Sequence, residues 1–174
     1  MKKIYIWISV AIIAAAVLLL YSYSQETGQI KIDAGGAIAE LQLAGGLFSK
    51  ATINSGAEPA KVSVRAHRPV QLSLSMKQGG DTWQIDSRGP WGKLSKISVN
   101  NNDTTVLKLG PPFLIKPGVR KRGLNVSVDF AIIGQASEQY QSVIRKNNRA
   151  VPAPKAKIID ETGNVLASGK FEYG

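Results

Sequence analysis

The chain has 174 residues, a net charge of +10 and no cysteine. This length suffices for one ordinary domain and falls short of two well-buried ones. The absence of cysteine excludes disulfides, thiolate zinc sites and thiol nucleophiles, and a single histidine, His67, excludes any mechanism that needs two imidazoles.

The first element in chain order is an uncharged run over residues 4–23, preceded by Lys2 and Lys3. As a helix rising about 1.5 Å per residue, this run would reach about 30 Å, the thickness of the hydrocarbon core of a bilayer. The run therefore predicts a signal-anchor helix that contacts the lipid bilayer. By the positive-inside rule, residues 1–3 are expected in the cytoplasm and the rest of the chain outside it.

A cleaved signal peptide is the alternative interpretation of the same segment. Ser22 and Ser24 are small residues at −3 and −1 of a cut before Gln25, and Lys2 and Lys3 form the basic region of such a peptide. The apolar run is longer than the core of about 7–15 residues that signal peptides usually have, which favours a retained anchor. Cleavage would make the protein secreted or periplasmic.

After a short polar tether at 24–28, apolar and polar residues alternate up to the end of the chain. The alternation is strongest over 124–132 and recurs over 30–34, 39–43, 62–66, 72–76 and 165–173. Clusters of Gly, Pro and Asn separate these runs, and short half-buried strands between turns are typical of sandwiches. The sequence predicts an all-β fold, an immunoglobulin-like or related antiparallel β-sandwich of eight or nine strands over 29–174, preceded by one N-terminal transmembrane helix.

The sequence also supports predictions for three shorter segments of this domain. Trp91 lies in a Gly- and Pro-rich loop and is expected to cover one end of the core. Residues 137–146 fit either a loop or one or two helical turns. Residues 155–174 form a hairpin signal, and its end is expected to close a sheet by burying Phe171 and Tyr173.

No arrangement of residues indicates catalysis, a cofactor or a metal. His67 lies between Arg65 and Arg68 and is expected on the surface at a strand end. The chain has no nucleophile elbow, no phosphate-binding loop and no ligand spacing for a metal, and its acidic residues are scattered. We therefore expect no catalytic, cofactor-binding or metal-binding residues.

Basic clusters are the remaining candidates for a binding site. The members of this predicted polyanion-binding set are Lys116, Arg120, Lys121, Arg122, Arg145, Lys146 and Arg149. Such residues can meet an acidic glycan, anionic lipid or an acidic envelope protein, or they can only keep the surface soluble. Nucleic acid is not expected, because no aromatic platform accompanies the charges.

These observations predict a non-enzymatic, membrane-anchored extracytoplasmic module that serves interaction or scaffolding in a cell-envelope complex. The first alternative is a secreted module that binds an acidic polymer or glycan through its basic surface. The second is a small hydrolase whose carboxylates the sequence does not identify, because catalytic partners need only meet in space.

Overall fold

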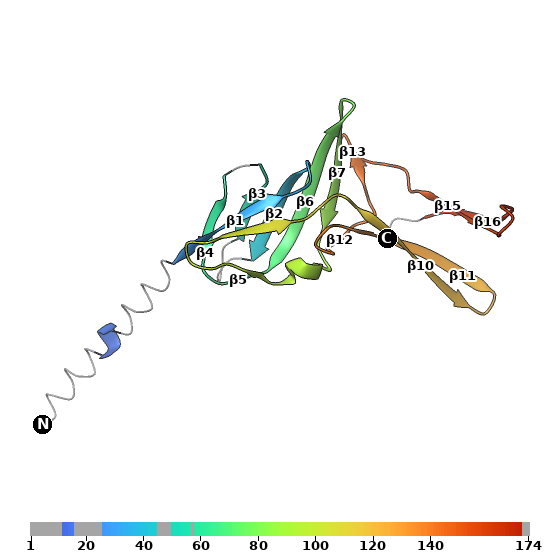
Figure 1. Ribbon diagram of the computed structural model, residues 1–174. Coiled ribbons are helices and arrows are strands. Elements are labelled where there is room, and N and C mark those ends of the chain that lie inside the picture. Colours follow the sequence, from blue (N-terminus) through green and yellow to red (C-terminus); the bar gives the residue numbers. More distant parts are fainter. Residues whose placement is uncertain (1–11, 16–25, 45–49, 57, 172–174) are drawn as a thin grey trace, which may run out of the picture.

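A computed structural model describes residues 12–15, 26–44, 50–56 and 58–171 (Figure 1). Most of these residues lie in β-strands, and nearly all strand pairs are antiparallel, which confirms the predicted all-β class. The described residues form sixteen strands, so the predicted number of eight or nine was too low. Five of the sixteen have only two residues, and pieces that short leave no readable alternation in a sequence.

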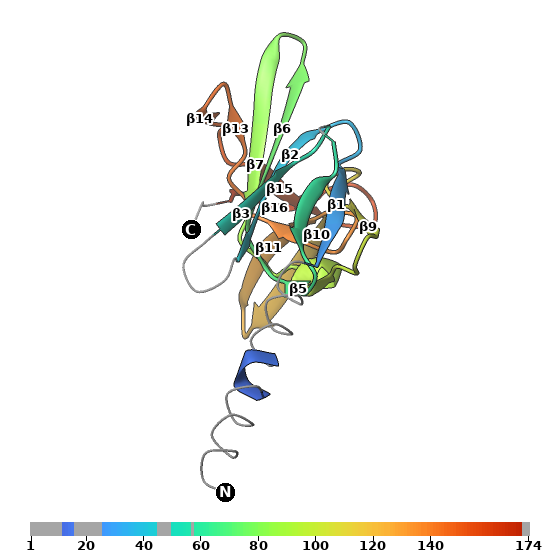
Figure 2. The same cartoon turned by 90° about the vertical axis from the view of Figure 1, so that its left-hand side faces the viewer.

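The largest sheet in these residues has six antiparallel strands in the order β14-β13-β7-β6-β2-β3. Its members are β2 (Ile38–Ala44), β3 (Lys50–Asn54), β6 (Pro69–Gln78), β7 (Asp81–Ser87), β13 (Arg145–Lys146) and β14 (Arg149–Ala150). The hairpin of β6 and β7 extends beyond its neighbours (Figure 2). A second sheet has the order β4-β1-β9 and contains β1 (Thr27–Asp33), β4 (Ala60–Ser63) and β9 (Thr104–Lys108), with β1 and β9 parallel.

Three further sheets complete the described strands. One contains β10 (Leu114–Arg122), β11 (Asn125–Ile133) and β12 (Gln139–Tyr140); the others pair β15 (Lys155–Ile159) with β16 (Val165–Lys170) and β5 (Ala66–His67) with β8 (Ile97–Ser98). A short 3₁₀ helix, η1 (Gly92–Ser95), follows Trp91, which packs against the core as expected.

Buried side chains of the first two sheets belong to one hydrophobic cluster. Alternate residues of β1 and β2 are buried, as the period-two runs over 30–34 and 39–43 predict. They join buried residues of β6 and β9 in one cluster, whose central members are Ile30, Ile32, Leu41, Leu43, Leu72, Leu74 and Leu107. Burial of these side chains is the main source of stability, at about 1.5–3 kcal/mol for each large one.

The prediction of a single-pass membrane protein is wrong. Across 12–15, 26–44, 50–56 and 58–171, no helix has the length and apolar character to cross a bilayer. Of the predicted span 4–23, only residues 12–15 are described; they are helical, and the others lie outside the described residues. An uncharged run of this length has the composition of a span, but composition alone does not establish one. The predicted localisation, a single-pass protein of the cell membrane, is wrong for the same reason.

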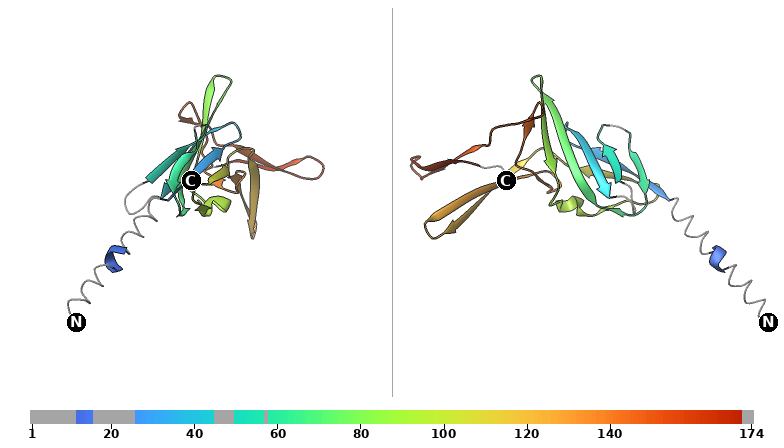
Figure 3. Two further views of the ribbon diagram at one scale, coloured as in Figure 1. Left: turned by 60° about the vertical axis from the view of Figure 1, so that its left-hand side comes forward. Right: turned by 180° about the vertical axis from the view of Figure 1, so that it is seen from behind.

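Two hairpins project from the body and point in different directions in the left view of Figure 3. We call residues 114–133, which form β10 and β11, arm 1, and residues 155–170, which form β15 and β16, arm 2. Arm 1 contains the strongest alternation of the sequence, and the expected strand is present over Asn125–Ile133. It is largely exposed, however, and Leu124 at its tip is fully exposed. Arm 2 confirms the predicted hairpin, but within the residues described it forms a separate two-stranded sheet and joins no larger one.

The base of arm 1 is held by the buried carboxylate of Glu138. Its Oε1 accepts hydrogen bonds from the Gly110 amide and the Tyr140 hydroxyl, both at 2.7 Å, and its Oε2 accepts one from the Ala136 amide at 2.8 Å. Gly110 precedes β10, whereas Ala136 and Tyr140 follow β11, so one side chain joins the two ends of the arm. Burial and the neighbouring carboxylate hold the pKa of Tyr140 far above its ordinary value.

Glu138 lies in the segment 137–146 that the sequence leaves as either loop or helix. The structure places β12 and β13 there and no helix. Gly134 is required nearby, because a Cβ at that position would lie 2.0 Å from Glu138 Oε1. The segment is therefore ordered by a hydrogen-bonded carboxylate rather than by a repeating backbone pattern.

We expect Glu138→Gln to destabilise the protein by about 1–3 kcal/mol. The Gln side chain has an NH2 group in place of one carboxylate oxygen, so this group would face at least one of the three buried donors and leave that donor without an acceptor. Urea unfolding followed by circular dichroism measures the loss. The matched substitution Glu58→Gln, at an exposed position, is expected to change stability by less than about 0.5 kcal/mol. Equal stability of the two variants would contradict the role given to Glu138.

Candidate functional site

The register of arm 1 divides its side chains between two faces. Residues directly opposite each other in an antiparallel pair point to the same face, and successive residues alternate. One face therefore carries the pairs Ile115–Ile132, Pro117–Phe130 and Val119–Val128, with Lys121–Val126 at the tip. The other carries Lys116, Arg120 and Arg122 together with Asp129, and the pair Leu114–Ile133 at its base. We call them the apolar face and the basic face of arm 1.

The first predicted basic cluster lies on this arm. Lys116, Arg120, Lys121 and Arg122 all belong to β10, and all four are exposed. Arg120 makes an ion pair with Asp129 across the hairpin. Within the described ranges, Lys116, Lys121 and Arg122 have no acidic side chain at ion-pairing distance. The structure thus places Lys116, Arg120 and Arg122 on one face and Lys121 on the other, and of the four only Arg120 has an acidic partner among the described residues.

Two residues of the second predicted cluster form ion pairs within the chain. Arg145 donates to Asp86 at 2.8 Å, and Lys146 lies 2.7 Å from Asp81. Lys146 also lies 5.4 Å from the centre of the Trp83 ring, a cation–π contact. The hydrogen bond from Lys146 is the main reason why the pKa of Asp81 is lowered. These contacts attach β13 to β7.

Arg149, the remaining predicted residue, is exposed on β14, beyond β13. β14 lies at the end of the six-stranded sheet, whereas β10 belongs to a separate sheet. The two basic clusters therefore belong to different sheets. The sequence could not distinguish them, because Asp81 and Asp86 are some sixty residues away from their partners along the chain.

Strand β10 is at the edge of its sheet. The order β10-β11-β12 leaves the other side of β10 without a neighbouring strand in the described residues. Pro117 fits an edge position, because proline has no amide hydrogen to donate to a ladder. An exposed edge of this kind is where an extended segment of another chain can add a strand.

Arm 2 turns its small and apolar side chains toward arm 1. A hollow of about 360 Å³ lies between the arms and is lined by Val126 and Val128 from arm 1 and by Ala156, Ile158 and Ala167 from arm 2. At the base of the hollow, Phe130 and Phe171 meet edge to face with ring centres 4.7 Å apart. Phe171 is thus half-buried, while Tyr173 lies outside the described residues. The sequence predicts strands in both arms, but it does not show that the two arms face each other.

The tip of arm 2 is shaped by Asp160. Its Oδ1 accepts hydrogen bonds from the Thr162 hydroxyl at 2.7 Å, the Asn164 amide at 2.8 Å and the Thr162 amide at 2.9 Å. The side-chain hydrogen bonds from Thr162 and Asn164 are the largest causes that lower the pKa of Asp160 to about 2. This carboxylate stabilises a turn and needs no ligand to explain it.

The single histidine is buried, although the sequence predicts it at the surface. His67 is buried on β5, with Nε2 2.9 Å from the Ser63 carbonyl oxygen and Nδ1 without a hydrogen-bond partner. The backbone pairing of β5 with β8 turns the side chain inward, which flanking arginines in a sequence do not reveal. In the part of the chain that the structure describes, no three His, Asp or Glu residues are grouped so as to hold a metal ion.

Comparisons with known proteins add no functional assignment. None of the protein-family models, curated proteins or solved structures compared with the chain matches it. The free edge, the two faces of arm 1 and the hollow between the arms therefore have to be interpreted from their own chemistry.

We expect the Asp160 carboxylate to titrate with a midpoint at about pH 2. Its pKa is lowered in the folded chain, so the stabilisation of the turn is present above the ordinary value of 3.8 and is lost as pH falls toward about 2. Carboxyl carbon shifts followed by NMR measure the midpoint. Thr162→Val removes one donor and is expected to raise it, whereas a midpoint near 3.8 in the unmodified chain would contradict the turn geometry.

Proposed function

We propose that the protein is a non-enzymatic interaction module that binds an extended, acidic segment of a partner protein along the free edge of β10. The observation that carries the proposal is the division of arm 1 into an apolar face, exposed at Ile115, Val119 and Val126, and an exposed basic face, beside an unpaired strand edge. A strand added there would place alternate side chains on the two faces. Acidic residues would then meet the basic face, and apolar residues would extend the apolar face.

Exposure of the apolar face supports a protein partner. Val119 and Ile115 on this face are 67% and 65% exposed, and Leu124 at the tip is fully exposed. An isolated two-stranded hairpin is only marginally stable in water, and contiguous exposed apolar residues are typical of interaction sites. A partner that covers these residues would stabilise the arm by removing apolar area from water.

Charge favours an acidic partner over a second copy of this chain. Arm 1 has four basic residues and one acidic residue, and arm 2 has three basic and two acidic residues. Two copies that meet by their arms would bring like charges together, and lysine and proline on an edge strand also hinder pairing of that edge with its own kind. An acidic segment meets no such barrier.

An acidic polymer is the second candidate ligand, and the unpaired Lys116 and Arg122 of the basic face favour it. A polyanion would contact the basic face, but it would leave the valines and isoleucines of the opposite face in water. Recognition of a protein segment accounts for both faces, so we prefer it.

Two peptides of identical composition distinguish these candidates. Both contain five Glu and five Val, in one alternating and in the other as two blocks. We expect the full chain to bind the alternating peptide about tenfold more tightly, measured by isothermal titration, because only alternation separates charge from apolar surface in an added strand. Equal affinities would contradict strand addition and favour the acidic polymer.

A charge-reversal pair tests the site itself. Lys116→Glu with Arg122→Glu is expected to weaken binding of the alternating peptide by about tenfold or more, since attraction becomes repulsion at two positions. Lys31→Glu with Lys61→Glu makes the same charge change at exposed positions of β1 and β4 and is expected to have a much smaller effect. If the two double variants bind equally, the basic face of arm 1 is not the binding site.

We further infer that the body is a β-sandwich of the immunoglobulin-like or a related kind. The shared core of the six-stranded sheet and the β4-β1-β9 sheet supports this type, because two layers with a common core define a sandwich. Methyl contacts in NMR spectra between Ile32 of β1 and Leu72 of β6 are expected if the sheets lie face to face. Their absence would contradict that arrangement.

A further inference from the structure

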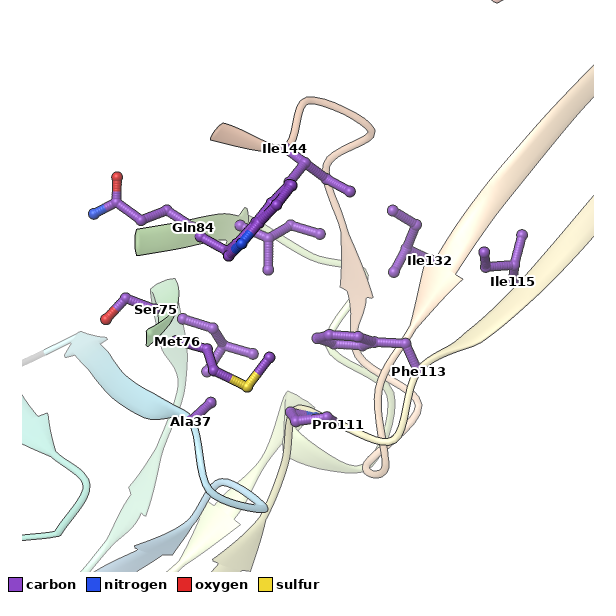
Figure 4. A pocket seen from close by; sticks show the side chains of 12 residues that line it. Ala37, Ser75, Met76, Gln84, Pro111, Phe113, Ile115, Ile132 and Ile144 are labelled. Carbon is purple, nitrogen blue, oxygen red and sulfur yellow. The ribbon is translucent and has the colours of Figure 1, made fainter. Parts of the chain in front are cut away.

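A second hollow, of about 180 Å³, opens at the base of arm 1 (Figure 4). Its wall is formed by side chains from β6, β7, β10 and β11 and from the segments before β10 and β13: Met76, Trp83, Phe113, Ile115, Ile132 and Ile144. The labelled side chains Met76, Phe113 and Ile132 surround a common space. We call this space the base pocket.

The surface of the base pocket is almost entirely carbon. A sugar, a phosphate or a charged side chain would lose its hydration there and gain no hydrogen bond, which disfavours all of them. An apolar group would gain by leaving water. Cavities of about 150 Å³ lined by Leu, Ile and Phe stay dry and hold a benzene molecule, so a pocket of this size fits a single aromatic ring.

The walls favour an aromatic ring over an alkyl chain. Phe113 is held edge to face against Tyr140 with ring centres 5.2 Å apart, and Tyr140 in turn donates to the buried Glu138. Trp83 forms part of another wall, and Met76 contributes a polarisable sulfur. Edge-to-face contacts and sulfur–aromatic contacts each add to the gain from burial, and both require a ring in the ligand.

The base pocket continues the apolar face of arm 1. Ile115 and Ile132 form the first cross-strand pair of this face and also line the pocket. Directly opposite residues of paired strands have Cβ atoms about 5 Å apart, so a residue of an added strand opposite Ile115 would lie at the mouth of the pocket. Its neighbour along the added strand would point to the other face, beside Lys116.

We propose that the base pocket binds an aromatic side chain of the partner segment, next to acidic residues that meet the basic face of arm 1. This inference rests on the proposed function and specifies the partner as an extended segment with an aromatic anchor at the end that lies beside Ile115. A bulky aromatic residue in a preformed pocket is the usual form of a dominant contact in protein interfaces.

Three synthetic peptides test the two parts separately. The first alternates Glu with Val and carries Phe at one end, the second has Ala in place of Phe, and the third keeps Phe but has Ser in place of Glu. We expect the full chain to bind the first peptide about tenfold to a hundredfold more tightly than the second, from burial of the ring. We also expect it to bind the first about tenfold or more tightly than the third, from charge.

The outcomes are distinct. If removal of Glu matters and removal of Phe does not, the aromatic anchor is wrong and the proposed function stands. If removal of Phe matters and removal of Glu does not, the pocket takes an aromatic ring but the acidic partner is wrong, so both proposals fail as stated. If no peptide binds, both are wrong.

A filling variant locates the ring. Ala37 is half-buried and lines the base pocket, so Ala37→Phe is expected to occupy the pocket and to reduce the advantage of the Phe peptide over the Ala peptide to within about twofold. Ala66→Phe, at an exposed position of β5, is the matched control and is expected to preserve the full advantage. A preserved advantage in Ala37→Phe would overturn the proposal.

A measurement on the unaltered chain guards against misfolding of that variant. NMR contacts are expected between the labelled Phe ring of the first peptide and the methyl groups of Met76, Ile132 and Ile144. A bound ring whose contacts lie elsewhere would overturn the base pocket as its site.

Discussion

The three hydrogen bonds accepted by Glu138 are the interaction on which the rest of the candidate site depends. They join the chain before β10 to the chain after β11, and the Tyr140 hydroxyl is one of the donors. Tyr140 supports Phe113, which forms a wall of the base pocket. A buried carboxylate is costly unless its hydrogen bonds are satisfied, so this arrangement is stable only as a whole. Arm 1 can therefore project from the body while its base remains fixed.

The protein uses its basic residues in two ways. Arg145 and Lys146 are neutralised by Asp86 and Asp81, and they attach β13 to the six-stranded sheet. Lys116 and Arg122 remain exposed on arm 1, where their charge is available to a partner. Basic residues thus form internal ion pairs on β13 and an exposed, charged face on arm 1. Only the position of acidic residues in space separates the two uses.

Much of the fold could be predicted from the sequence, and most of the candidate site could not. The runs around Ile30 and Leu41 alternate because one face of each strand is buried, and the structure confirms both. The run over 124–132 has the same pattern and is indeed a strand, but alternation does not reveal whether an apolar face meets the core or solvent. The membrane span predicted from the uncharged run over 4–23 is wrong, because composition alone does not establish a span. Glu138 carries no sequence signal, since its donors at Gly110, Ala136 and Tyr140 follow no fixed spacing.

Hydrogen exchange of the Gly110 and Ala136 amides tests the central claim most directly. Both amides donate to the carboxylate of Glu138 and lie outside the strands. If Glu138 holds the base of arm 1, they exchange as slowly as the amides of the core strands β2 and β6, through opening of the whole fold. Exchange as fast as that of exposed turn amides would show that the base of arm 1 opens locally, and would contradict a fixed arm with a preformed pocket beneath it.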